Sequence, residues 1–425
     1  MISLSSRGKR ALPFAMASAA VASLVIAAPV WAEPLSLVTA LTRAAQADPA
    51  AQATQQRLAA ASANIRQASV RPNPSLGLEV ENALGSGPYG GIDRAETTLS
   101  YQQSYERGGK RTARIGAAQA QRDLIAAQGR LRTWNVVWDA HRLWIEAMAA
   151  EAEAVLAADR LSLAKAAQAE IGRRVAAARD PLFAGSLADS DVASSRIALD
   201  QATAKARQLR LELASLWNGG ADFDLDPAWL NDVSAAGATP ALIETPDVEV
   251  LRAQQRVAAA EIKVETSRRT QDPTLQAGIR HFKADDAFAF VIGGTLPLGR
   301  YNTNQGAVAR SQAEAMAAAT DIEAAERIRS REIAASTLRL VNAAEEVRRI
   351  EAEVIPQAER AVTQVREGFA RGGFTYRDVM GAQDSLLKVR ARRLEILKQF
   401  HLEQARRERL SGKWAAVLPD METAQ

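Results

Sequence analysis

The sequence contains an internal repeat, and a repeat that spans about half of the chain constrains the fold more than any other feature. The segment Gln55–Ala61 recurs as Gln254–Ala260, and the same offset of 199 residues aligns Pro74 with Pro273. The offset is smaller farther along, because the first copy carries a glycine-rich insertion, Gly85–Gly91. The chain is therefore predicted to fold as two similar halves.

Each half has the same order of predicted elements. A shorter helix, Leu35–Val70 in the first half and Val248–Arg269 in the second, precedes two strand candidates and a long helical pattern. The pattern that starts at Gly109 would run for roughly 100 Å at the usual rise of a helix. Turn residues at Arg179–Ser186 and Arg371–Thr375 predict that each half makes one long helical hairpin. Helices of this length suit a tube or rod better than a compact domain.

The long helices have the seven-residue apolar spacing of helices that pack side by side, as in a coiled coil. The residues with this spacing are Leu124, Leu131, Trp138 and Ile145 in the first half, and Ile333, Leu340, Val347 and Val354 in the second. We expect Trp134, Trp138 and Trp144 to fill gaps in this packing.

The strand candidates alternate between apolar and polar residues. Leu76, Leu78 and Val80 alternate with Gly77, Glu79 and Glu81, and the second half repeats the pattern around Phe288, Phe290 and Ile292. This two-residue period suits a sheet with lipid on one face and water on the other. The same pattern also fits a small soluble hairpin packed on a helix, so the strands alone do not decide between the two.

Residues 1–32 have the features of a secretory signal: a basic start, an apolar stretch and small residues before an expected mature start at Glu33. Removing its three positive charges from the 53 Lys and Arg leaves 50 basic against 49 acidic residues. This balance gives no indication of a nucleic-acid partner.

The residue types that support chemistry are scarce. The chain has no cysteine, which excludes disulfides, thiolate metal ligands and a lipid-modified cysteine. His141, His281 and His401 are isolated and show no metal-ligand spacing, and His141 falls in the apolar seam, as a core residue would. We expect no metal site, no cofactor and no enzyme activity, since no nucleophile–base pair or cofactor loop stands out.

The expected domain organisation has five parts. They are a signal peptide (1–32), a first repeat (33–217), an inter-repeat linker with three prolines (218–246), a second repeat (247–412) and a loosely ordered C-terminal tail (413–425).

Three segments of the second half carry a family resemblance. Val354–Glu359, Glu367–Gly372 and Asp378–Gln383 resemble the second-repeat signature of the outer-membrane factor (TolC) family, and the shared order of elements covers nearly the whole mature chain. Glu79–Asn82 and Glu106–Arg111, with the glycine-rich loop, resemble the heavy-metal efflux branch of CzcC-like channels. The resemblance also accounts for Pro356, which is unusual inside a helix.

The resemblance implies a mainly α fold with a small β part. Three chains would form a 12-stranded transmembrane β-barrel in the outer membrane, continued by an α-helical barrel in the periplasm. The implied function is a passive exit duct of a tripartite efflux system, with a periplasmic adaptor (membrane fusion protein) and an inner-membrane RND-type pump, and with divalent heavy-metal cations as cargo. Two alternatives stay open: a drug or dye efflux channel of the same fold, and a periplasmic coiled-coil adaptor protein.

The resemblance also implies roles for particular residues. Asp378 matches an acidic residue near the periplasmic entrance, where three copies would form an acidic ring at the gate. Asp191 aligns with it in the first repeat, at an offset of 187 residues. The family often has a second acidic residue where this chain has Gly381, and helix capping is the other interpretation of Asp378 and Asp191. Gly372 and Gly373 would form the turn that contacts the adaptor.

Overall fold

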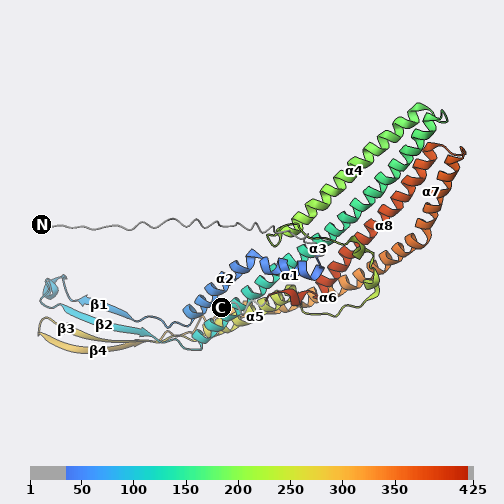
Figure 1. The fold of residues 1–425 in the computed structure, drawn as a ribbon. Helices are drawn as coiled ribbons and strands as arrows, with labels where there is room; N and C mark the ends of the chain where they lie inside the picture. The colour runs from blue at the N-terminus through green and yellow to red at the C-terminus, as the bar shows by residue number, and fades with distance from the viewer. Residues whose placement is uncertain (1–34, 420–425) are drawn as a thin grey trace, which may run out of the picture.

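The computed structural model describes residues 35–419, and the predicted signal peptide lies outside them. The molecule is long and narrow: a small sheet lies at one end, two helical hairpins end at the other, and packed helices fill the space between (Figure 1). Within residues 35–419, no helix combines the length and the apolarity needed to cross a membrane.

The predicted order of elements is confirmed in both halves. The first half contains α1 (Leu37–Ala47), α2 (Pro49–Ala68), β1 (Ser75–Glu81), β2 (Glu96–Ser104), α3 (Lys110–Ala176) and α4 (Leu182–Ser215). The second half contains α5 (Pro246–Ser267), β3 (Thr274–Phe282), β4 (Ala287–Thr295), α6 (Gln305–Arg349), α7 (Ile355–Ala370) and α8 (Tyr376–Ser411). In each half, a helical segment and two strands precede a long helical hairpin.

The single helix predicted over Leu35–Val70 is wrong in one respect, because it breaks into α1 and α2. Pro49 has no backbone N–H to donate, so a helix that contains it must start again there. Asp48 caps the new start, since its side chain accepts a hydrogen bond from the backbone N–H of Ala50 at 2.9 Å. The Asp-Pro pair was the sequence signal for this break.

Pro356 is accommodated by a wider turn of the helix. A π-helical segment, Ile350–Val354, joins α6 to α7, and Pro356 lies in the first turn of α7. A proline near a helix start removes a donor that has no partner there in any case. The chain thus bends between α6 and α7, and each part keeps its own hydrogen bonds.

The four strands form one antiparallel sheet in the order β1-β2-β3-β4. Each half supplies a hairpin, and β2 pairs with β3 to join them, with Leu99 opposite Ile279. β1 and β4 are therefore the edge strands. The two halves of the chain share this sheet, although their strands are far apart in sequence.

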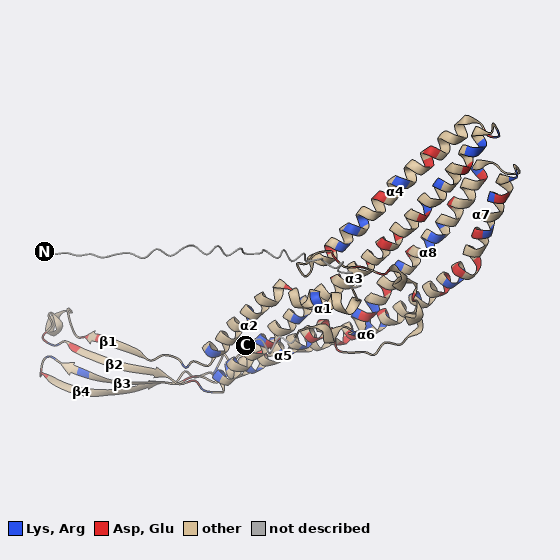
Figure 2. Ribbon diagram, viewed as in Figure 1, with Lys and Arg blue, Asp and Glu red and all other residues tan. Residues whose placement is uncertain are grey.

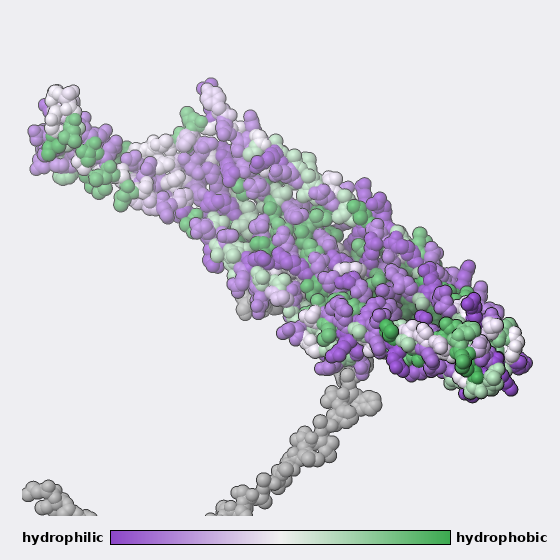
Figure 3. Space-filling model, turned by 90° about the horizontal axis from the view of Figure 1, so that it is seen from above, coloured by the Kyte–Doolittle hydropathy of each residue, from purple (hydrophilic) through white to green (hydrophobic). Residues whose placement is uncertain are grey.

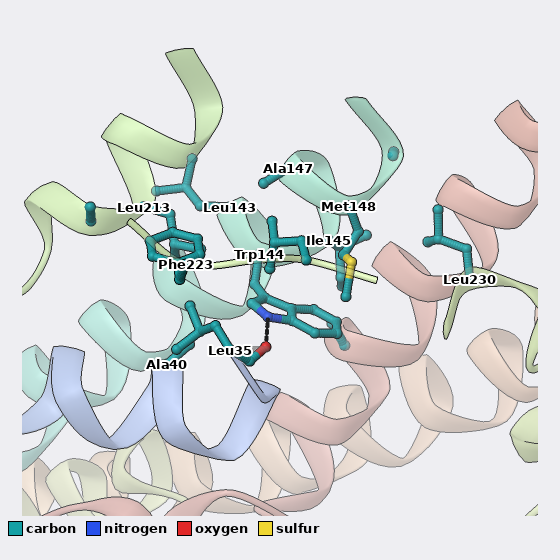
Figure 4. Close-up of a cluster of buried hydrophobic side chains, with 14 residues drawn as sticks. Leu35, Ala40, Leu143, Trp144, Ile145, Ala147, Met148, Leu213, Phe223 and Leu230 are labelled. Atoms are coloured by element: carbon teal, nitrogen blue, oxygen red, sulfur yellow. Dashed lines mark hydrogen bonds between the residues drawn. The ribbon is translucent and has the colours of Figure 1, made fainter. Parts of the chain in front are cut away.

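The central core surrounds the middle of α3. Trp144 is 2% exposed, and its indole Nε1 donates to the backbone oxygen of Leu35 at 3.4 Å (Figure 4). Phe223 and Leu230 of the inter-repeat segment pack into the same cluster, and Trp229 meets Trp144 edge to face with ring centroids 4.5 Å apart. The expected role of the tryptophans in packing is confirmed, because Trp134 is also buried and Trp138 packs against the cluster.

The C-terminal segment differs from the expected loose tail over the part that the structure describes. Trp414 packs with Val417 and Leu418 against the cluster that contains Leu41 of α1. The Trp414 indole also donates to the buried carboxylate of Glu408 at 2.8 Å. The apolar side chains after Gly412 pack on this core. The sequence did not indicate this, because the apolar run is short.

Replacing Trp144 with Ala should lower the free energy of unfolding by about 3–5 kcal/mol, because it leaves a large cavity in the central core. The matched control is Val155→Ala on the exposed side of the same helix, which should cost about 0.5 kcal/mol or less. Urea unfolding followed by circular dichroism measures both. Equal costs for the two variants would contradict this description of the core.

Candidate functional site

The sheet has one apolar face, and this face is exposed. Alternate residues of all four strands point to it, and Phe290 and Ile292 of β4 are 86% and 87% exposed. The other large apolar residues on this face are Leu76, Leu78, Val80, Leu99, Tyr101, Leu275, Ile279 and Phe288. Figure 3 shows hydrophobic residues gathered at the sheet end of the molecule. An exposed apolar surface of this size marks a contact with lipid or with another protein.

The opposite face of the sheet is polar or small. Its charged residues are Glu79 and Glu81 on β1, Glu96 on β2 and Arg280 on β3. Its other residues are mostly Ser, Thr, Gln, Gly and Ala, with Val291 and Phe282 as apolar exceptions. The predicted alternation is thus present in all four strands, and it separates two surfaces of different chemistry.

Both the sheet and the layer of helices have two outer elements with a neighbour on one side only. In the sheet, β1 and β4 each have one neighbour, so half of their backbone groups have no ladder partner among residues 35–419. At the helical end, α3 contacts α4 and α8, and α8 contacts α7, so that α4 and α7 are the outer helices of the layer (Figure 1). The chain therefore has the form of a segment of wall with two free sides.

The two hairpin tips are tied together by Arg174 of α3. Its guanidinium binds Asp180, with Nε 2.5 Å from a carboxylate oxygen, and Nη1 donates to the backbone oxygen of Phe369 at 2.6 Å. The guanidinium also lies 4.3 Å from the centre of the Phe369 ring, within cation–π distance. Beneath this contact Ile171 and Val379 pack against Phe369. No pattern in the sequence indicated this role for Arg174, since many other arginines have similar neighbours.

Asp378 caps the start of α8. Its carboxylate accepts hydrogen bonds from the backbone N–H and the hydroxyl of Thr375, at 2.8 and 2.7 Å, and its own N–H faces the Thr375 hydroxyl at 3.4 Å. These hydrogen bonds lower the pKa of Asp378 below its ordinary value. The interpretation of Asp378 as a helix-capping residue is thus confirmed, and its exposed carboxylate stays charged at the hairpin tip.

The alignment placed Asp191 in the turn equivalent to that of Asp378, but in the structure Asp191 lies in a different turn of its helix. Asp378 is the third residue of α8, whereas Asp191 is the tenth residue of α4. A shift by one heptad keeps the same residues on the packing face. The sequence alignment therefore does not determine which turn of α4 corresponds to which turn of α8.

Asp191 instead faces α8 from the third turn of α4. It lines a groove of about 320 Å³ together with Arg160, Arg377 and Asp384. Burial raises the pKa of Asp191, and the negative charge of Asp384 adds to this effect against the opposing charge of Arg160. Burial also raises the pKa of the neighbouring Tyr376 hydroxyl to about 12, and the charge of Asp191 contributes to that increase.

Gly372 and Gly373 form the tight turn between α7 and α8. Gly372 has a left-handed backbone, with φ of 86°, and its N–H donates to Phe369. The N–H of Gly373 donates to the backbone oxygen of Gly368 at 2.8 Å. On the neighbouring tip Leu182 and Phe183 are exposed, so the helical end presents apolar side chains beside the glycine turn.

The three histidines have different surroundings. His141 is buried in the core, as predicted, and burial lowers its pKa to about 4, so it is neutral. His401 is buried and contacts the backbone oxygen of Leu230 at 2.9 Å, and His281 contacts Asp286 at the end of β3. Within residues 35–419, His, Asp and Glu side chains form no group of three that could hold a metal ion.

Known proteins share this architecture. The outer membrane protein VceC from Vibrio cholerae superposes with a TM-score of 0.66 at 20% identity, and covers 91% of this chain and 97% of its own. The channel CusC gives a TM-score of 0.68 at 14% identity, with 88% and 91% covered. The outer-membrane channel OprN also gives 0.68, at 13% identity, with 88% and 89% covered. The chain therefore has the fold of outer-membrane channels.

The sequence is similar to metal-resistance proteins. The cobalt-zinc-cadmium resistance protein CzcC of Cupriavidus metallidurans is 27% identical over 392 residues, which are 90% of this chain and 91% of that protein. The nickel and cobalt resistance protein CnrC of the same organism is 29% identical over 310 residues, 66% and 69% of the two chains. No family model matches the sequence. The resemblance to the outer-membrane factor (TolC) family and its heavy-metal branch is confirmed by these relatives and by the fold.

Replacing Gly372 with Ala should weaken the tip, because a side chain on a left-handed residue costs about 1 kcal/mol. The matched control is Gly373→Ala, whose added Cβ would meet no atom closer than 3.6 Å. The substitution should lower the free energy of local opening of the turn by about 1 kcal/mol. Trypsin should then cleave after Arg371 about fivefold faster in the Gly372 variant, and in that variant alone. Equal cleavage rates in the two variants would contradict the strain assigned to this turn.

Proposed function

We propose that this protein is the outer-membrane channel of a tripartite efflux system, a passive exit duct for divalent heavy-metal cations that extends from the outer membrane into the periplasm. The observation that carries the proposal is the sheet: it exposes an apolar face, has a polar face behind it, and has two open edges. Such a sheet suits a wall with lipid outside and water inside.

The open edges require further copies of the chain. In lipid, unpaired backbone groups each cost several kcal/mol, so a sheet that crosses a bilayer must close on itself. Four strands are too few to enclose a water-filled bore. Three copies, with β1 of one chain against β4 of the next, would supply twelve strands and leave no edge. We therefore propose a homotrimer.

The helices would continue the wall through the periplasm. The outer helices α4 and α7 of neighbouring copies would pack together, as α3 and α8 pack within one chain. The hairpin tips would then surround the periplasmic entrance. There we propose that Asp378 and Asp191 contribute to the gate, and that the turn at Gly372 and Gly373 contacts the periplasmic adaptor. An inner-membrane pump would supply the energy for export.

The relatives favour metal ions as cargo. Their names associate two of them with resistance to cobalt, zinc and cadmium and to nickel and cobalt. A conduit has to release what it carries, so export of a metal does not require a tight metal site in the channel. Drug or dye efflux is the second candidate, since the same fold serves either cargo. The adaptor alternative is not favoured, because the fold matches channels over nearly the whole chain.

Introduced cysteines can test closure of the ring, because the natural chain has none. Cysteine at Gly77 on the polar face of β1 should form an intermolecular disulfide with cysteine at Ala289, Val291 or Gly293 on the polar face of β4. Gel electrophoresis without reductant should show a covalent trimer for at least one of these pairs. The controls pair Gly77 with Phe290 or Ile292 on the opposite face and should remain uncrosslinked. Absence of a trimer with every polar-face pair would contradict the ring.

Deletion of the gene tests the cargo. Loss of the duct should lower tolerance to cobalt, zinc, cadmium or nickel, and the wild-type gene should restore it. Tolerance to a panel of dyes serves as the control, because a metal-specific duct should leave it unchanged. Sensitivity to dyes with unchanged metal tolerance would favour the drug-efflux alternative.

A further inference from the structure

Arg280 of β3 connects three strands on the polar face of the sheet. Its Nη2 lies 2.7 Å from a carboxylate oxygen of Glu81 on β1, and its Nη1 lies 2.8 Å from a carboxylate oxygen of Glu96 on β2. Its Nε donates to the hydroxyl of Thr98 at 2.8 Å. The planar guanidinium offers several donors in fixed directions, which suits this three-way contact. One cation thus lies between two carboxylates of neighbouring strands.

Glu79 adds a third carboxylate next to this network. It lies in the same row across the strands, since Thr98 is opposite Glu79 on one side and opposite Arg280 on the other. Among the residues that the structure describes, the Glu79 side chain makes no ion pair and no hydrogen bond. The polar face therefore carries three carboxylates and one guanidinium in each chain.

These charges gather at one end of the sheet. Figure 2 shows the charged residues of the strands near the end farthest from the helices, and the remaining length of the strands is almost free of charge. The nearby loops add one negative charge: Asp93 and Arg94 offset each other, and Lys283 offsets one of the two carboxylates of the β3–β4 turn, Asp285 and Asp286. The polar-face network is thus the main charged feature that would face the bore at this end.

We propose that Arg280 sets the ion selectivity of the exit bore by reducing the negative potential that Glu79, Glu81 and Glu96 produce at its outer mouth. The inference rests on the proposed function, in which the polar face lines the water-filled interior. Rings of charged side chains decide which ions a pore admits. Three copies would place three of these networks around one ring, with two negative charges in excess for each copy. Without Arg280 the excess would be three.

The test uses the full chain in planar lipid bilayers, with KCl at different concentrations on the two sides. The reversal potential gives the permeability ratio of potassium to chloride. Arg280→Gln should raise this ratio by about twofold or more, because it strengthens the negative potential at the mouth. Arg280→Lys should leave the ratio close to the wild-type value, and Glu79→Gln should lower it.

A double variant separates charge from structure. Glu96→Gln with Arg280→Gln has the wild-type charge balance, so its ratio should return to the wild-type value, although the ion pair is absent. The inference is overturned if conducting Arg280→Gln channels keep the wild-type ratio, or if the double variant stays as cation-selective as Arg280→Gln.

Glu79→Gln keeps the inference testable if Arg280→Gln does not assemble, because the substitution removes no ion pair or hydrogen bond that Glu79 makes within residues 35–419 of its own chain. An unchanged ratio in this variant would overturn the electrostatic role of the outer mouth. A wild-type protein that forms no ion-conducting pore would instead contradict the proposed function itself.

Discussion

The backbone of the two edge strands is the constraint on which the rest of the structure depends. Along one side, β1 and β4 have hydrogen-bonding groups with no ladder partner among residues 35–419, and they belong to a sheet whose apolar face is exposed. An apolar environment suits the side chains of that face but leaves the edge groups without partners. In the proposed ring, closure with further copies would satisfy both requirements at once. The long helices would then continue the wall of that ring.

The internal repeat builds the segment of wall from two similar halves. Each half supplies one hairpin of strands and one hairpin of helices, and the two halves lie side by side through the pairing of β2 with β3. The halves are not identical: the π-helical segment before Pro356 bends the second helical hairpin, whereas α3 of the first runs unbroken from Lys110 to Ala176. The tips therefore differ in detail, with a capping box on α8 and an arginine tie at the end of α3.

Local patterns in the sequence predicted most of the fold. Alternation at Leu76–Val80 identified the two faces of the sheet, and seven-residue spacing identified the packed helices. The pairing of β2 with β3 was not predictable in this way, because it joins segments far apart in the sequence. Arg174 and Arg280 were also missed: their partners lie on other elements or across a turn, and nothing in the sequence distinguishes them among the 53 Lys and Arg residues. For Asp191 the sequence alignment indicated the wrong turn, because heptad packing tolerates a shift of seven residues.

If one chain is a third of a closed wall, the assembled particle contains three chains. Native mass spectrometry of the protein extracted from membranes in mild detergent measures the number of chains in that particle. We expect a particle with the mass of three chains. A monomer that retains its folded sheet in detergent, with the edges of β1 and β4 unpaired, would contradict the closed ring.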